Sequence, residues 1–106
     1  MLNEKLIQEI VKRIVENHNP EKLLIYGSQA NGDTNKDSDI DLLVIKNSDL
    51  PRYKRSRKIR FLLKGLKLPF DIIEYTPEEI EKWKNVKNSF IYNVFHSSKV
   101  LYEREN

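Results

Sequence analysis

The sequence contains no cysteine, which excludes disulfide bonds and thiolate-bound metal centres. Glycine is scarce, with three residues, and proline occurs four times, so neither forms a low-complexity segment. No apolar run approaches the roughly 18 residues of a membrane span. The first residues also lack the basic-then-apolar layout of a secretion signal. From these absences we expect a cytoplasmic protein with no membrane association.

Length and charge describe one small, highly charged globular unit. The 106 residues are enough for one hydrophobic core, so a single domain over 1–106 is expected. Charged residues make up 33% of the chain and the net charge is +3. Its distribution is uneven, because eight basic residues and no acidic one lie between Arg52 and Lys67. That segment favours anions, whereas the aspartates of residues 39–49 favour cations.

The hydrophobic pattern alternates between helical and strand periods. Helical spacing covers residues 3–17 and ends before Pro20, and short apolar runs predict strands at 22–26, 39–46, 70–75 and 100–102. Further helices are expected over 29–32, from Pro51 onward, after the Thr76-Pro77 start signal and over 87–97. This order predicts an α/β (α+β) fold with helices packed on a small mixed β-sheet.

Two of these helices have a predicted apolar side. In the helix after Pro51, the inward side is formed by Ile59, Leu62, Leu63 and Leu66, and Gly65 should weaken the last turn. In the helix over 87–97, the apolar side is formed by Phe90, Ile91, Val94 and Phe95.

Three aspartates are the candidate metal ligands and catalytic groups. Asp39 and Asp41 are two residues apart on a strand, so they share a face with alpha-carbons roughly 6.5–7 Å apart. Two carboxylates at that spacing repel unless a cation lies between them, and oxygen ligands suit Mg²⁺ or Mn²⁺. Asp71 is the expected third ligand, on a strand that can neighbour the first, while Glu74 points to the opposite face.

The Gly27-Ser28 pair is the candidate phosphate-binding turn. Glycine lets a phosphate approach the main chain closely because it has no beta-carbon. Ser28 begins the short helix over 29–32, whose free amide groups attract anions, and its hydroxyl adds a donor. A triphosphate is therefore expected to lie between this turn and the aspartates.

Each of these features alone also has an ordinary structural explanation. A Gly-Ser pair can be a turn, an Asp-x-Asp pair can be a solvated strand start, and Asp71 can be an ion-pair partner. His18 and His96 are expected to be structural or exposed, and the aromatic Tyr26 is expected in the core. The combination of the features at fixed spacing favours a functional site.

The spacing of Gly27-Ser28, ten residues and Asp39-Ile40-Asp41 resembles the signature of the polymerase-beta-like nucleotidyltransferase superfamily. The resemblance covers nearly the whole chain. It includes the apolar strands that flank the motif and Asp71 at the position of the third carboxylate. The small size and the tail from Thr76 to Glu103 are similar to the minimal nucleotidyltransferases, the MntA-type antitoxins.

The resemblance implies a specific activity. Gly27 and Ser28 would hold the nucleotide triphosphate, and Asp39 and Asp41 would bind Mg²⁺, with two ions expected and Mn²⁺ possible. Asp71 would complete the site and help to deprotonate the acceptor. Such proteins transfer AMP from ATP, and many silence a HEPN-type toxin by adenylylating one of its tyrosines. The chain is thus expected to be a protein adenylyltransferase and the antitoxin of a toxin–antitoxin pair.

One position departs from the family pattern. Family members often have arginine where this chain has Asn31, and asparagine lacks the charged, forked grip of arginine on phosphate. Either Lys36 or the basic helix over 52–60 takes over this contact, or nucleotide binding is weaker.

Three alternatives to protein adenylylation remain open at this stage. The chain can be a non-catalytic subunit that binds nucleotide or neutralises a partner. It can modify a small molecule, as aminoglycoside nucleotidyltransferases do, with a self-dimer supplying the acceptor side. The basic stripe from Arg52 to Lys67 can also bind nucleic acid, although this reading is less favoured.

Overall fold

A four-stranded mixed sheet with helices on both faces forms the protein. The computed structural model describes residues 3–27, 30 and 39–105. The elements in order are α1 (Glu4–His18), β1 (Lys22–Tyr26), β2 (Ile40–Ile45), α2 (Arg52–Arg55), α3 (Arg57–Leu62), β3 (Phe70–Tyr75), α4 (Pro77–Trp83), α5 (Phe90–His96) and β4 (Lys99–Glu103). The strand order is β3-β2-β1-β4, in which β2 and β3 are parallel and the other two pairs are antiparallel. The expected mixed sheet and its edge strand at the C-terminus are confirmed.

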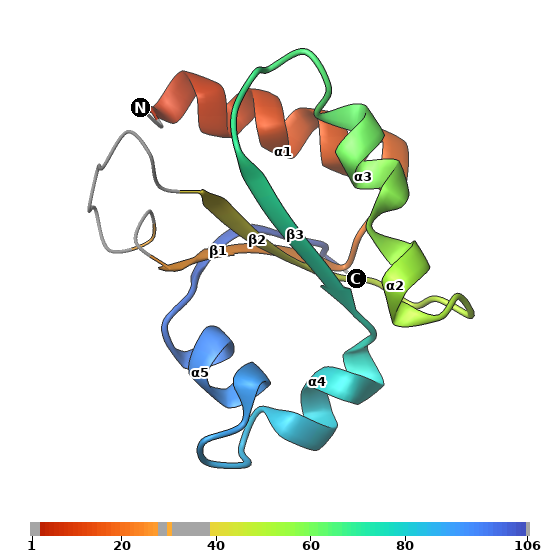
Figure 1. Cartoon of the computed structure of the whole chain (residues 1–106), viewed down its shortest axis with the longest axis vertical. Helices are drawn as coiled ribbons and strands as arrows, with labels where there is room; N and C mark the ends of the chain where they lie inside the picture. Colours follow the sequence, from red (N-terminus) through yellow and green to blue (C-terminus); the bar gives the residue numbers. More distant parts are fainter. Residues whose placement is uncertain (1–2, 28–29, 31–38, 106) are drawn as a thin grey trace.

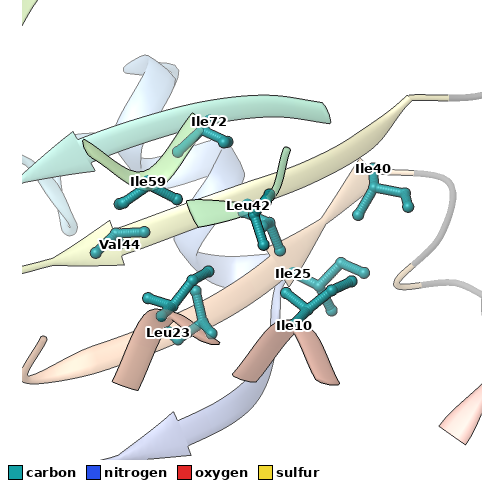
Figure 2. Close-up of a cluster of buried hydrophobic side chains, with 10 residues drawn as sticks. Ile10, Leu23, Ile25, Ile40, Leu42, Val44, Ile59 and Ile72 are labelled. Atoms are coloured by element: carbon teal, nitrogen blue, oxygen red, sulfur yellow. The ribbon is translucent and has the colours of Figure 1, made fainter. Parts of the chain in front are cut away.

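The helices lie in two layers (Figure 1), with α1 and α3 on one face of the sheet and α4 and α5 on the other. Because side chains alternate along a strand, β2 supplies both layers: Leu42 and Val44 face α1, and Leu43 and Ile45 face α4 and α5. Figure 2 shows the first cluster, in which Ile10 of α1 and Ile59 of α3 pack against strand residues. Among residues 3–27, 30 and 39–105, no helix is both long and apolar enough to cross a bilayer.

Two helices differ from the sequence-based expectation. The single helix expected from Pro51 is divided at Ser56 into α2 and α3, and Pro51 is the N-cap residue. Ile59 and Leu63 point inward as predicted. Helix α5 is shorter than 87–97 because Asn88 has a positive φ of 68° and Ser89 caps the helix.

The shortened α5 changes the position of one aromatic residue. Phe90 was expected on the apolar side of this helix, but it is its first residue and is 53% exposed. Ile91 and Val94 of the same helix are buried as expected.

Glu74 is buried on the α1 side of the sheet, where it binds His18. The two side chains are only 2% and 8% exposed, and His18 Nε2 lies 2.6 Å from Glu74 Oε1. A buried carboxylate needs such a partner because its desolvation is costly. The prediction that Glu74 points away from the Asp71 face is confirmed, and His18 is a structural residue.

The start of α4 holds a second well-bonded carboxylate. The N–H of Thr76 donates to Glu79 Oε1 at 2.8 Å, and the N–H of Glu79 donates to Thr76 Oγ1, which completes a capping box. Arg55 donates to the same carboxylate at 2.6 Å, and Arg52 at 3.3 Å. Burial alone would raise the pKa of Glu79, but these donors outweigh it and lower that pKa to about 2.

We predict that Glu79→Gln lowers the free energy of unfolding at neutral pH by about 1–2 kcal/mol, because the amide loses the charge-assisted bonds. The ionised carboxylate stabilises the fold above the ordinary pKa of 4.5, and this contribution is lost as the pH falls toward the folded-state pKa of about 2. Urea unfolding at pH 7 and about pH 3 should therefore show a smaller difference between variant and wild type at the lower pH. Glu78→Gln, an exposed change in the same turn, is the control. A difference that is the same at both pH values would contradict this account.

Candidate active site

Three polar side chains form a row across the sheet, where β1 ends and β2 and β3 begin. Tyr26 pairs in register with Asp41, and Asp41 pairs in register with Asp71. Residues one position away, such as Leu42 and Ile72, belong to the cluster on the α1 side. The row therefore points to the face that carries α4 and α5. The predicted proximity of Asp71 to Asp41 is confirmed.

The charges of the row act on one another. Burial raises the pKa of the Asp41 carboxyl group, and repulsion from Asp71 and then from Asp39 raises it further. Burial also raises the pKa of the Tyr26 phenol well above its usual range, with further increases from Asp41 and Asp71. The phenol therefore stays protonated and can donate a hydrogen bond beside the carboxylates. Tyr26 was expected in the core, and it does pack, partly buried, against the cluster on the α4 and α5 side; its place in the row was not predicted. The signal that could have placed it here is its position directly before Gly27 on a strand that can pair with β2.

The donor set suits a hard divalent cation, because hard cations take oxygen ligands and a positive charge would relieve the repulsion on Asp41. In the part of the chain that the structure describes, no three His, Cys, Asp or Glu side chains are arranged as a group that could hold a metal ion. Asp39 and Asp71 are exposed, whereas Asp41 is half-buried. Coordination of one ion by all three aspartates would therefore require side-chain rotation, for which the exposed pair has room.

Gly27 packs its main chain against the Asp41 carboxylate. It has a positive φ of 75°, and a beta-carbon built at this position would collide with Asp41 Oδ2. Only glycine meets both constraints without strain. The predicted turn is thus in contact with the predicted acidic site. Ser28, Asn31 and Lys36, together with most of the helix expected over 29–32, lie outside the described residues.

The basic helices do not replace the missing arginine at this row. Helix α3 contributes Ile59 to the cluster on the α1 side, opposite to the face of Asp41. Arg52 and Arg55 of α2 bind Glu79 at the start of α4. Arg52 and Arg55 therefore contact the end of β3 and the start of α4, whereas the carboxylates lie near the start of β3.

We predict that Gly27→Ala destabilises the fold by about 1–2 kcal/mol from its positive φ alone, and by more because of the collision with Asp41. In an Asp41→Ala background the collision is removed, so the same substitution should cost less. A double-mutant cycle by urea unfolding measures this coupling. An equal cost in both backgrounds would show that the close contact has no energetic effect.

We also predict that Asp71→Asn lowers the pKa of Asp41 toward its ordinary value. The substitution makes Asp71 neutral, and Asp71 repels the Asp41 carboxylate more strongly than Asp39 does. Carboxyl-detected NMR titration measures this pKa directly. Asp49→Asn, an exposed change outside the row, is the control. An Asp41 pKa that does not respond to the Asp71 substitution would disprove their electrostatic coupling.

Sequence comparison relates most of the chain to known proteins. A family model described as a nucleotidyltransferase domain matches residues 7–96. A protein of Methanocaldococcus jannaschii named "putative protein adenylyltransferase" is 33% identical over 104 residues, which cover 96% of this chain and all of that protein.

Structure comparison finds the same fold in several solved structures, among them the following three. A "putative nucleotidyltransferase" from Sulfolobus solfataricus has a TM-score of 0.66 at 25% identity, covering 96% of this chain and 81% of that one. A toxin–antitoxin complex with AMP-PNP has a TM-score of 0.66 at 20% identity, covering 93% and 74%. A tri-AMPylated Shewanella oneidensis HEPN toxin in complex with MNT antitoxin has a TM-score of 0.57 at 18% identity, covering 92% and 70%.

Proposed function

The chain belongs to the nucleotidyltransferase domain family, and from that premise we propose that it transfers AMP from ATP to a hydroxyl group of a partner protein. The observation that carries the proposal is the in-register pairing of Asp41 with Asp71 beside Gly27. The chain is 33% identical to a protein named "putative protein adenylyltransferase" over that protein's full length. This similarity supports a protein as the acceptor.

In this proposal, Gly27 and Ser28 bind the triphosphate, and Asp39, Asp41 and Asp71 hold Mg²⁺. The bound ions would polarise the alpha-phosphate and neutralise the charge of the leaving pyrophosphate. Gly27 leaves open the space that a side chain would fill next to Asp41. Tyr26, whose phenol stays protonated, donates a hydrogen bond to a phosphate oxygen.

Asp71 is the proposed general base. It is exposed at the edge strand β3, where an acceptor can approach, whereas Asp41 is covered on both sides by β1 and β3. The Asp71 carboxylate takes the proton of the acceptor hydroxyl while the hydroxyl oxygen forms a bond to the alpha-phosphorus of ATP. The bond from that phosphorus to pyrophosphate then breaks. Most of the rate enhancement comes from positioning and charge stabilisation.

The proposed acceptor is a tyrosine of a HEPN-type toxin, which makes this chain the antitoxin of the pair. The support is similarity in fold to an MNT antitoxin bound to an AMPylated HEPN toxin. A self-dimer is the other arrangement that would bring an acceptor to the open edge of β3.

A non-catalytic role is the second candidate. Asn31 stands where family members often have arginine, and the described aspartates do not form a ready metal-binding group. In that case the chain would bind nucleotide or its partner without turnover.

We predict that Asp41→Asn and Asp71→Asn each reduce AMP transfer by at least about 10²-fold, because each weakens the binding of Mg²⁺ and Asp71→Asn also removes the proposed general base. Both variants should remain folded, since they relieve repulsion between like charges. The assay combines the purified protein, ATP labelled at the alpha-phosphate, Mg²⁺ and a HEPN-type toxin as the acceptor protein. Mass spectrometry then locates any added AMP.

Asp49→Asn is the matched control, because it removes the same charge at an exposed position outside the row. Transfer by Asp41→Asn at the wild-type rate would contradict the proposed site. Transfer by no form of the protein, with ATP still bound, would favour the non-catalytic role.

A further inference from the structure

The charge of the molecule is divided between one segment and the rest. Residues 52–67 contain eight of the nineteen lysines and arginines and no acidic residue. The other 90 residues carry eleven basic and sixteen acidic side chains, a net charge of −5. A basic segment on an otherwise acidic molecule is a localised electrostatic surface for an anionic partner.

Most of these basic side chains point to solvent. Arg52 and Arg55 bind Glu79, but six others are exposed and take part in none of the ion pairs among the described residues. We call them the basic face; its members are Lys54, Arg57, Lys58, Arg60, Lys64 and Lys67. Three of them, Arg60, Lys64 and Lys67, line a shallow hollow of about 300 Å³ beside the edge strand β3. The positive charges thus lie along the edge of this hollow as well as on the surface of α3.

Two large aromatic side chains are exposed among these charges. Tyr53 is 73% exposed and Phe61 is 72% exposed. Ile59, in the same helix as Phe61, is buried. Arg57 and Phe61 are four residues apart in α3, so they are neighbours on its surface. Lys54 Nζ lies 5.8 Å from the centre of the Tyr53 ring. Flat rings interleaved with cations are the combination that binds phosphates and stacks unpaired bases.

We propose that the basic face, together with Tyr53 and Phe61, binds single-stranded RNA. The cations contact the phosphate backbone, and the two rings stack against unpaired bases. RNA is the nucleic acid that commonly presents unpaired bases in loops and ends. The α3 part of this surface lies on the α1 side of the sheet, opposite to the face of the aspartates. The α2 part is joined to α4 through Glu79.

The test measures binding of a fluorescein-labelled 15-nucleotide single-stranded RNA by fluorescence anisotropy. The triple variant Arg57→Gln, Arg60→Gln, Lys64→Gln should bind about tenfold more weakly or worse at low salt. Its plot of log affinity against log salt should be shallower by about two, because three phosphate contacts are lost. Tyr53→Ala and Phe61→Ala should each weaken RNA binding about fivefold or more while leaving the salt dependence unchanged.

The matched control is Lys12→Gln, Lys87→Gln, Lys99→Gln, which removes the same net charge from exposed positions elsewhere. It should retain affinity close to that of the wild type. Circular dichroism should show that all variants are folded, since every substituted side chain is exposed.

Several results would overturn the proposal. These are an absence of RNA binding by the wild type at low salt, equal losses in the two triple variants, unchanged RNA affinity in both aromatic variants, and equal competition by polyphosphate of the same charge. Duplex RNA and single-stranded DNA of the same sequence are the comparison ligands. Tighter binding of single-stranded RNA than of the duplex supports base stacking, and equal binding of the duplex contradicts it.

Discussion

The parallel pairing of β2 with β3 sets Asp41 beside Asp71, and the repulsion between these two carboxylates organises the rest of the site. The backbone of Asp41 is held between two neighbouring strands. Burial raises the pKa of its carboxyl group, and repulsion from Asp71 and then from Asp39 raises it further. On its other side, the Tyr26 phenol stays protonated and Gly27 leaves room for the Asp41 carboxylate. A cation at this point would turn an unfavourable arrangement into a favourable one.

The alternation of side chains along β3 separates two tasks. Asp71 points to the face of α4 and α5, and Glu74 points to the face of α1. Both are acids, but Glu74 is buried and bound to His18, whereas Asp71 is exposed at a sheet edge. Burial and a partner make Glu74 structural, and exposure beside a second carboxylate makes Asp71 available for chemistry. Helix α3, which carries part of the basic face, packs on the α1 layer, opposite to the face of the aspartates.

Most of the fold could be predicted from the sequence, because the hydrophobic periodicity of a helix or strand lies within its own residues. The strands over 22–26, 40–45 and 70–75 appear as short apolar runs, and the α4 capping box is readable from Thr76 and Glu79. The division of the helix after Pro51 at Ser56, and the short α5 that exposes Phe90, were not predicted. The second depends on the left-handed backbone of Asn88, which has no clear pattern in the sequence.

Only part of the candidate site could be predicted, because some of its contacts join residues that are far apart in the sequence. The strand predicted over 39–46 places Asp39 near Asp41, although in the structure Asp39 directly precedes β2. The predicted neighbouring strand over 70–75 adds Asp71, in agreement with the family resemblance. Tyr26 joins the row only through the register between β1 and β2, which is set by packing across the whole sheet. The buried bond between His18 and Glu74 likewise joins residues 56 positions apart, so neither residue reveals the other.

Paramagnetic NMR with Mn²⁺ and a non-hydrolysable ATP analogue tests the central claim most directly, because Mn²⁺ broadens the signals of nearby nuclei. The account predicts the strongest broadening at Tyr26, Gly27, Asp41 and Asp71, weaker broadening at the far ends of β2 and β3 around Ile45 and Tyr75, and loss of the broadening in Asp41→Asn. Broadening centred elsewhere, or unchanged by that substitution, would contradict a nucleotide-bound cation at this row of carboxylates.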